Sequence, residues 1–153
     1  MTPDEHVKHL LKTSKEVQSL FNSELPTIVG VEGVNFFTES FQNEGFTDEV
    51  LEPWPDVKRR TNPTRPDRAA ATRKILTGET GDLGRSIDFT PSPGEVAIKS
   101  DKEYAAAHNE GTTTAGRNHN VTIPKRQFIG ESKAFDKIVK DITEDRLKRA
   151  QGI

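Results

Sequence analysis

The chain has 153 residues and a mass of 17.0 kDa, the size of one domain, and its net charge of -2 is close to neutral. Hydrophobic residues make up 31% and charged residues 30%, with a mean hydropathy of -0.72, so we expect a thin core that partner subunits complete. The lack of cysteine excludes a disulfide framework and thiol catalysis. No apolar run reaches the roughly 20 residues that span a membrane, and the N-terminus lacks a signal-peptide pattern. We therefore predict a soluble, unexported single domain over residues 1–153 with no membrane partner.

The charges are strongly segregated along the chain. Residues 16–56 hold nine acidic side chains and no lysine or arginine, whereas residues 57–74 hold seven lysines and arginines and one aspartate. Opposed charged surfaces of this kind set the register between subunits and are screened by salt beyond about 10 Å. The two blocks could therefore attract each other.

The N-terminal part predicts two helices. Thr2, Pro3 and Glu5 form a capping box with proline at the first helical position, and apolar residues then recur at helical spacing, which predicts a helix over residues 2–24. We expect Pro26 to end it. A second amphipathic helix is predicted over residues 31–43, with Gly45 as its C-terminal cap. The apolar positions of these helices are Val7, Leu10, Leu11, Val17 and Phe21, then Val34, Phe37 and Phe41.

Proline-flanked and basic segments follow. Trp54 stands between Pro53 and Pro55, which predicts an extended segment anchored by the indole in the core. Residues 57–74 combine arginines with two prolines and few apolar side chains, which predicts an exposed, flexible basic arm. Its cations could neutralise phosphates, so a nucleic-acid-binding module using residues 58–74 is the alternative function. The candidate partner-binding residues of the arm are Lys58, Arg59, Arg60, Arg65, Arg68 and Arg73.

Residues 75–130 predict the sheet region. Two alternating runs at 86–90 and 95–99, separated by a Pro-Ser-Pro-Gly turn, predict a β-hairpin, and residues 121–123 predict a third strand. We expect one helical turn at 102–107 and a flexible loop at 112–120. A final amphipathic helix over 132–149 carries Phe135, Ile138, Val139 and Ile142 on one stripe, with Lys148 and Arg149 near its C-terminus. The fold class is therefore α+β, a small antiparallel sheet with packed amphipathic helices and extended arms.

No motif in the sequence specifies a catalytic, metal or cofactor site. His108-Asn109-Glu110 matches the H-x-E of zinc deaminases, but the cysteine ligands of that site are absent. His6 and His9 are an incomplete metal pair, and the glycine-rich residues 77–84 lack the Gly-Lys-Ser/Thr ending of a phosphate loop. There is no G-x-S-x-G motif either, so a small hydrolase is only the third hypothesis.

Three stretches carry a resemblance to a known family. They are Ile75 to Ile87 (ILTGETGDLGRSI), Tyr104 to Gly111 (YAAAHNEG) and Ile123 to Gly130 (IPKRQFIG). In this order, with Phe41 and Trp54 upstream and an amphipathic helix downstream, they resemble the phage Mu-like virion morphogenesis family over residues 28–147. The family pattern usually has proline after the arginine of the third stretch, where this chain has Gln127.

The resemblance implies a structural protein of a tailed-bacteriophage virion and no enzyme. It implies a subunit of a hexameric ring in the neck or tail, which completes the tail or joins head to tail. The implied partners are copies of itself, other neck, connector and tail proteins, and, transiently, packaged DNA in the lumen. Such a protein is made in the bacterial host cytoplasm and located in the virion.

The resemblance also gives structural roles to residues of the three stretches. Gly78 and Gly81 would allow a tight backbone, Tyr104 would bury its ring and bond through its hydroxyl, and His108 would cap or pair locally. Arg126 would hold a carboxylate, as a further partner-binding candidate, while Pro124 and Phe128 close the sheet. The full set of family-motif residues is Gly78, Gly81, Leu83, Tyr104, His108, Gly111, Pro124 and Phe128.

Overall fold

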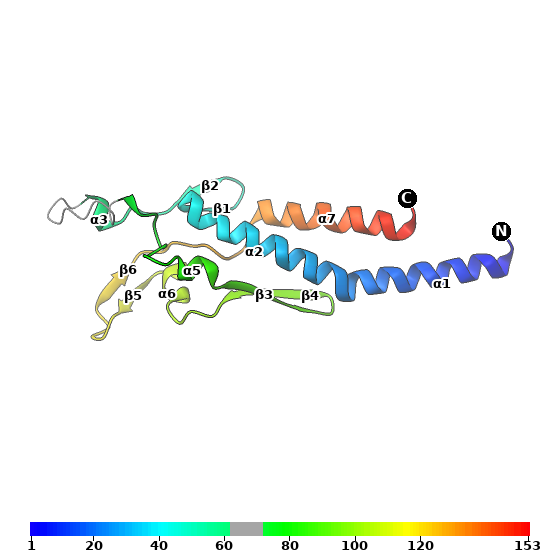
Figure 1. Cartoon of the computed structure of the whole chain (residues 1–153), viewed down its shortest axis with the longest axis horizontal. Coiled ribbons are helices and arrows are strands. Elements are labelled where there is room, and N and C mark those ends of the chain that lie inside the picture. The colour runs from blue at the N-terminus through cyan, green and yellow to red at the C-terminus, as the bar shows by residue number, and fades with distance from the viewer. Residues whose placement is uncertain (62–71) are drawn as a thin grey trace.

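The computed structural model describes residues 1–61 and 72–153, and its axis is one long helical rod (Figure 1). The rod consists of α1 (Pro3–Ser19), a π-helical turn η1 (Leu20–Glu24) and α2 (Leu25–Asn43). Three two-stranded antiparallel sheets and further helices accompany the rod within the described residues, so the fold is α+β as the sequence predicts. The sheets are β1 (Gly45–Thr47) with β2 (Leu51–Pro53), β3 (Ile87–Ser92) with β4 (Glu95–Ser100), and β5 (Thr112–Ala115) with β6 (Val121–Ile123). The other helices are α3 (Lys58–Thr61), α5 (Asp82–Arg85), α6 (Ala105–Glu110) and α7 (Lys133–Gln151).

The N-terminal helix begins as predicted but does not end at Pro26. Thr2 and Glu5 form the reciprocal capping box. Pro26 lacks an N–H and would clash with the carbonyl one turn earlier in a regular α-helix. The wider turn η1 resolves this conflict, because the Leu25 N–H bonds to the Leu20 carbonyl, five residues back. The Phe21 carbonyl instead accepts from the N–H of Gly94, 3.1 Å away in the β3–β4 turn. The hairpin tip thus satisfies a backbone group of the π-turn, and the helix continues to residue 43.

The glycines of α2 let the β3–β4 hairpin approach closely. The hairpin is the one predicted from the alternating runs, with Phe89 opposite Ile98. A Cβ at Gly30 would overlap the ring of Phe89, and one at Gly33 would overlap Ile98. The absence of side chains here therefore lets the hairpin lie directly on the helix, which outweighs the helix-weakening effect of glycine.

Aromatic side chains form the core where α2 meets the loops. Phe41 packs against the ring of Trp54 at 5.6 Å and that of Phe128 at 5.2 Å. The Trp54 indole N–H donates to the Gln127 carbonyl at 2.7 Å, so the extended segment is anchored as predicted. The buried hydrophobic cluster consists of Phe37, Phe41, Phe46, Trp54, Ile75, Leu83, Ile87, Ala105 and Phe128.

The β1–β2 hairpin holds the start of α7. Ser132 caps this helix by accepting from the Phe135 N–H, and its hydroxyl donates to the Thr47 carbonyl at 2.7 Å. The Asp48 carboxylate accepts from the Lys133 N–H at 2.8 Å, where a negative charge also suits the helix dipole. The hairpin and the helix start are therefore one fixed unit.

Several boundaries differ from the sequence-based predictions. The cap of α2 is Glu44 in the left-handed conformation (φ 51°), and Gly45 already belongs to β1, where a Cβ would lie 2.6 Å from the Glu52 carbonyl oxygen. Residues 112–120 are not a loop throughout, because 112–115 form β5 and pair with the predicted strand 121–123. That strand lies in a sheet separate from β3–β4. The described residues therefore form separate two-stranded sheets and not the one small sheet that the sequence predicts.

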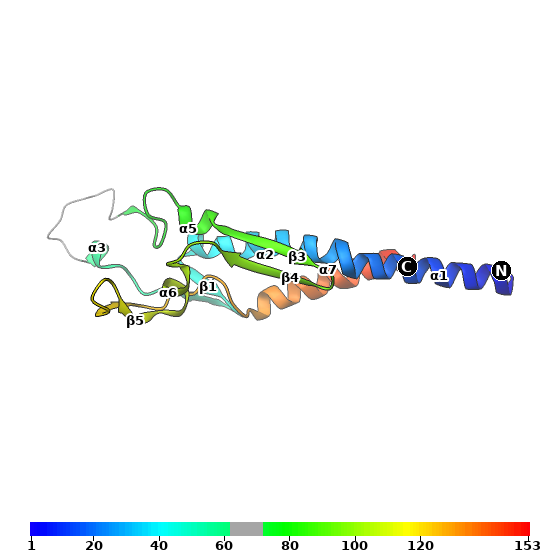
Figure 2. The same ribbon diagram turned by 90° about the horizontal axis from the view of Figure 1, so that it is seen from below.

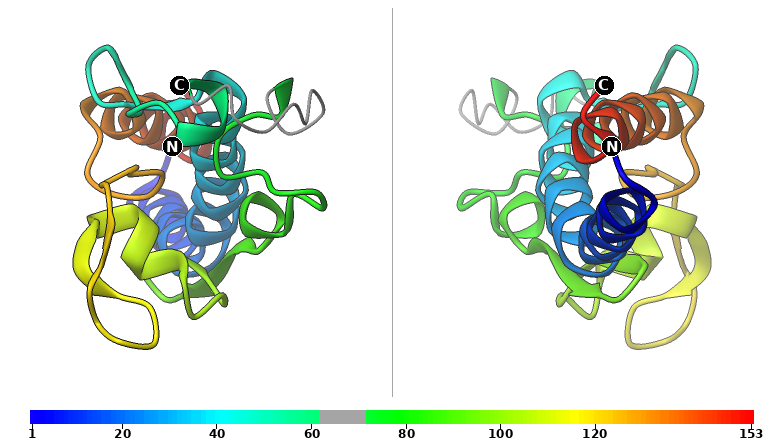
Figure 3. Two further views of the ribbon diagram at one scale, coloured as in Figure 1. Left: turned by 90° about the vertical axis from the view of Figure 1, so that its left-hand side faces the viewer. Right: turned by 90° about the vertical axis from the view of Figure 1, so that its right-hand side faces the viewer.

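The molecule is elongated, with α1 projecting at one end (Figures 1 and 2). The helix α7 lies beside the rod, and the N-terminal end of α1 extends beyond the C-terminal end of α7 (Figures 1 and 2). The end-on views show the other elements grouped around the rod (Figure 3). No described helix is long and apolar enough to cross a membrane. The N-terminal turns of α1 therefore lie beyond the rest of the fold.

Candidate assembly surface

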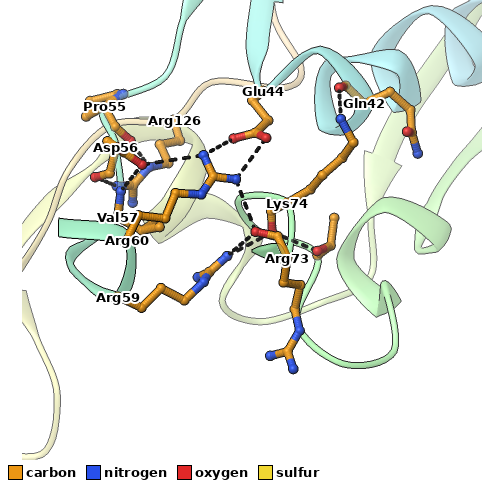
Figure 4. Close-up of polar contacts among 11 residues, drawn as sticks. Gln42, Glu44, Pro55, Asp56, Val57, Arg59, Arg60, Arg73, Lys74 and Arg126 are labelled. Atoms are coloured by element: carbon orange, nitrogen blue, oxygen red, sulfur yellow. Dashed lines mark hydrogen bonds and ion pairs between the residues drawn. The ribbon is translucent and has the colours of Figure 1, made fainter. Parts of the chain in front are cut away.

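Hydrogen bonds and an ion pair connect the base of the basic arm to the end of α2 (Figure 4). The Arg60 guanidinium donates to both Glu44 carboxylate oxygens, at 2.7 and 2.9 Å, and to the Arg73 carbonyl at 3.1 Å. Its side chain is 26% exposed and that of Glu44 is 23% exposed. This bidentate geometry is the strongest form of arginine–carboxylate pair. The acidic and basic blocks therefore do attract each other, but within one subunit at this point.

Other cations of the arm bind backbone carbonyls. The Arg59 guanidinium donates to the carbonyls of Arg73 and Lys74 at 2.9 and 3.0 Å, and the Lys74 ammonium donates to the Gln42 carbonyl at 2.7 Å. Arg73 itself lies 3.9 Å from the Glu79 carboxylate. These contacts hold the two ends of the arm together. The arm was predicted as flexible over residues 57–74, and its middle lies outside the described residues.

The structure shows Arg126 bound to backbone carbonyls and not to the carboxylate that was predicted for it. Its guanidinium donates to the backbone carbonyls of Pro55 and Asp56, both at 2.9 Å, and the residue is only 7% exposed. Burial lowers the pKa of Arg126, and the nearby charge of Arg59 lowers it further, yet an arginine stays protonated at these values. Arg126 therefore tethers the segment after Trp54 to the strand exit at residue 123.

The Glu44–Arg60 pair should make stability depend on acid. The hydrogen bonds from Arg60 hold the pKa of Glu44 below its ordinary value of 4.5. Its stabilising contribution is thus present above pH 4.5 and is lost as the pH falls through the lowered folded-state pKa. We expect Glu44→Gln to cost about 1 kcal/mol near neutral pH and to reduce the acid dependence of unfolding free energy. Urea titrations between about pH 7 and pH 3 measure this. Glu39→Gln, an exposed change on the same helix, is the control, and equal acid dependence in both variants would contradict the prediction.

Asn109 is an important residue that the sequence analysis did not single out. Its side-chain oxygen accepts from the N–H groups of Phe128 and Ile129, at 2.9 and 3.0 Å, and its amide donates to the Ile129 carbonyl at 3.0 Å. One side chain thus pairs α6 with the segment after β6 as a neighbouring strand would. The sequence signal for Asn109 is its position in the YAAAHNEG stretch, directly after His108.

Tyr104 and His108 differ from their predicted roles. Tyr104 is 47% exposed, so its ring is not buried, and it meets the His108 ring edge to face at 6.1 Å. The buried Nδ1 atom of His108 has no hydrogen-bond partner within the described part of the chain. Burial lowers the pKa of His108 below 6.5, and the positive charge of Arg126 lowers it further. The imidazole is therefore held neutral in the fold.

Neutral burial of His108 should make stability fall in mild acid. Because the unfolded chain binds a proton at a higher pH than the fold does, stability is complete above about pH 6.5 and declines as pH falls from there toward the lowered pKa. We expect His108→Gln to flatten the stability curve between about pH 7.5 and pH 5. Chemical denaturation across that range checks the slope, with the exposed His9→Gln as control. An unchanged slope in His108→Gln would refute the assignment.

The remaining family-motif residues are placed as follows. Gly78 and Gly81 have φ values of 55° and 68°, the left-handed region that glycine tolerates. Gly111 has φ 74°, and a Cβ there would lie 2.8 Å from the Lys125 nitrogen. Leu83 and Phe128 are buried in the core, whereas Pro124 is exposed directly after β6. Phe128 thus fills the core and does not close a sheet.

The helix α1 leaves an apolar stripe in solvent. Val7, Leu10 and Leu11 are 54–58% exposed, and Phe21 is 41% exposed at the root of the helix. Phe21 also lines a mostly apolar pocket of about 190 Å³ between the rod, the tip of the β3–β4 hairpin and α7. Its other walls are Leu25, Pro26, Val29, Gly94, Glu95, Val96, Val139 and Thr143. The stripe and the pocket are apolar surfaces that the described residues leave uncovered.

The predicted partner-binding residues are thus partly gathered and partly unplaced. Arg59, Arg60 and Arg73 converge at the base of the arm, with Lys58 beginning α3, while Arg126 lies nearby and binds the Asp56 carbonyl. Arg65 and Arg68 lie outside the described residues. No cluster of three or more metal-ligating side chains occurs within residues 1–61 and 72–153. Contacts of these cations with a second subunit stay a prediction.

The chain was compared with known proteins. No curated protein and no solved structure matches it. The model of the phage virion morphogenesis family matches residues 45–148, which excludes the rod at residues 3–43 but includes the three motif stretches and most of α7. The match covers more than half of the chain. The chain therefore belongs to the phage virion morphogenesis family, and its role lies in the assembly of a bacteriophage virion.

Proposed function

We propose that the protein is a structural, non-enzymatic subunit of a ring in the neck of a tailed phage, where it completes the tail or joins the head to the tail. The observation that carries this proposal is the exposed apolar stripe of α1 in a chain of this family. Apolar side chains repeated along one face of a projecting helix usually mark a protein interface. Ring subunits meet through two different patches, one on each side of a subunit.

The elongated shape also supports an assembling subunit. An elongated molecule with α1 at one end and α3 at the other offers separate contact surfaces along its length (Figures 1 and 2). The proposed partners are further copies of the chain in a hexameric ring and adjoining connector and tail proteins. Packaged DNA would pass through the lumen and touch the ring transiently.

Imaging of the purified full-length chain tests the ring. Negative-stain images and sedimentation over a concentration series should show closed rings that replace single subunits as concentration rises. A phage with the gene inactivated should release filled heads and tails that are not joined, or tails of abnormal length. Single subunits at every concentration, together with no binding to virion components, would overturn the proposal.

The alternative, a nucleic-acid-binding module, gains less support from the structure. Arg59, Arg60 and Lys74 already bind carbonyls or Glu44 within the subunit. A DNA binder that uses several cations loses affinity steeply as salt rises. Tight DNA binding by the single subunit with such a salt dependence would therefore favour the alternative.

A further inference from the structure

We infer that the apolar stripe of α1 is covered by the β1–β2 hairpin of a second copy of the chain. This inference rests on the proposed assembly into a ring and names the two surfaces that meet. It is argued from exposure, charge and the fixed position of the hairpin.

The stripe on α1 is bordered by lysines. Leu11 lies between Lys8 and Lys15, three residues before it and four after it, which are its neighbours on the helix surface. Neither lysine forms an ion pair with any residue in the described part of the chain, and Lys12 pairs only weakly with Glu16 at 3.8 Å between exposed side chains. The free surface is therefore apolar in the middle and basic at one edge.

The β1–β2 hairpin presents the complementary combination. Val50 is 71% exposed and Leu51 is 44% exposed, which is unusual for two adjacent large apolar residues. They stand between Glu49 and Glu52, both exposed. Glu52 forms no ion pair within the described residues, and Glu49 pairs with the exposed Lys133. The hairpin tip therefore carries two exposed apolar side chains and two exposed acidic side chains.

The hairpin is also held ready for binding. Ser132 and the backbone of α7 bind the carbonyls of Thr47 and Asp48, so the tip does not need to be ordered when it docks. Less conformational entropy is lost when a preformed surface binds. The contact cannot form within one copy, because the hairpin lies beside the start of α7 while α1 projects beyond its far end (Figure 1).

Basic groups at the base of the arm are engaged within the subunit. Glu44 is bound by Arg60, and Arg59 and Lys74 donate to backbone carbonyls. At the hairpin tip Glu49 pairs with Lys133, which leaves Glu52 without an ion pair among the described residues. The lysine edge of α1 can supply a cation for Glu52 and brings an apolar surface with it.

Engineered cysteines test the contact directly, because the natural chain has none. A Leu11→Cys copy mixed with a Val50→Cys copy should form a disulfide-linked dimer on mild oxidation. The variant that carries both changes should form a ladder of linked subunits. The control combines Leu11→Cys with Val121→Cys, an exposed valine on another hairpin, and should stay unlinked.

Charge exchange provides an independent measurement. Lys8→Glu with Lys15→Glu should raise the concentration needed for half-assembly by about tenfold, and adding Glu49→Lys with Glu52→Lys should recover most of the loss. All four side chains are exposed, so thermal unfolding should change little.

Three outcomes would overturn the inference. Leu11→Cys that links to itself as readily as to Val50→Cys would show that α1 pairs with α1. Rings that form without any 11-to-50 link would show that another surface covers the stripe, while leaving the proposed ring intact. Single subunits at every concentration would remove both the ring and this contact.

Discussion

Replacing Phe128 with alanine should destabilise the fold by about 4 kcal/mol, a large part of the 5–15 kcal/mol that holds a typical domain together. Phe128 is 1% exposed and packs against Phe41 in the centre of the hydrophobic cluster. Removing the ring leaves a cavity between α2 and the segment after β6. Both segments are held by other contacts, so they cannot easily move together to fill it. Urea unfolding at one fixed protein concentration measures the loss.

Phe21→Ala is the matched control for this prediction. Phe21 is a phenylalanine in the π-helical turn η1, 41% exposed, and its truncation should cost about 1 kcal/mol or less in the single subunit. Phe128→Leu should fall between the two because it leaves a smaller cavity. Equal losses for the Phe128 and Phe21 truncations would show that Phe128 is not central to the core.

Replacing Asn109 with alanine should cost about 3 kcal/mol. The change leaves the N–H groups of Phe128 and Ile129 and the Ile129 carbonyl without their partner at a part-buried site. Each such group loses a hydrogen bond that water replaces poorly. Unfolding free energy at neutral pH is the measurement.

Two further variants make the Asn109 prediction specific. Asn109→Asp keeps the acceptor for both N–H groups but loses the donor to Ile129, so its cost should be intermediate. Asn118→Ala, at an exposed turn between β5 and β6, should change stability by about 0.5 kcal/mol or less. An Asn109→Ala protein as stable as Asn118→Ala would mean that the bridge contributes nothing.

Local signals in the sequence were sufficient for most of the elements. The capping box at Thr2, the apolar stripe of the last helix and the alternating hairpin runs each depend on residues a few positions apart, and the structure contains the two helices and the hairpin that they predict. The anchoring of Trp54 also followed from its flanking prolines. The family could be predicted because its motifs are runs of consecutive residues.

Long-range contacts explain what the sequence could not predict. Whether Pro26 ends the helix depends on a π-turn whose free carbonyl is satisfied by Gly94, 73 residues further along the chain in the hairpin turn. The bridge from Asn109 and the carbonyl contacts of Arg126 likewise join distant segments. The charge pattern indicates that the arginines pair with acidic residues, but it does not identify the partner of each arginine.

The α+β class, the starts of the first and last helices, the β3–β4 hairpin and the family could be predicted from the sequence alone, because each depends on periodicity, capping or contiguous motifs. Only the tertiary structure decided that the rod is continuous, that Arg60 pairs with Glu44 within the subunit, and that the stripe of α1 stays in solvent. The physical reason is that burial and partner choice depend on which distant segments arrive at a surface. The N-terminal turns of α1 extend past the other described elements, so the apolar face of this helix stays exposed (Figure 1).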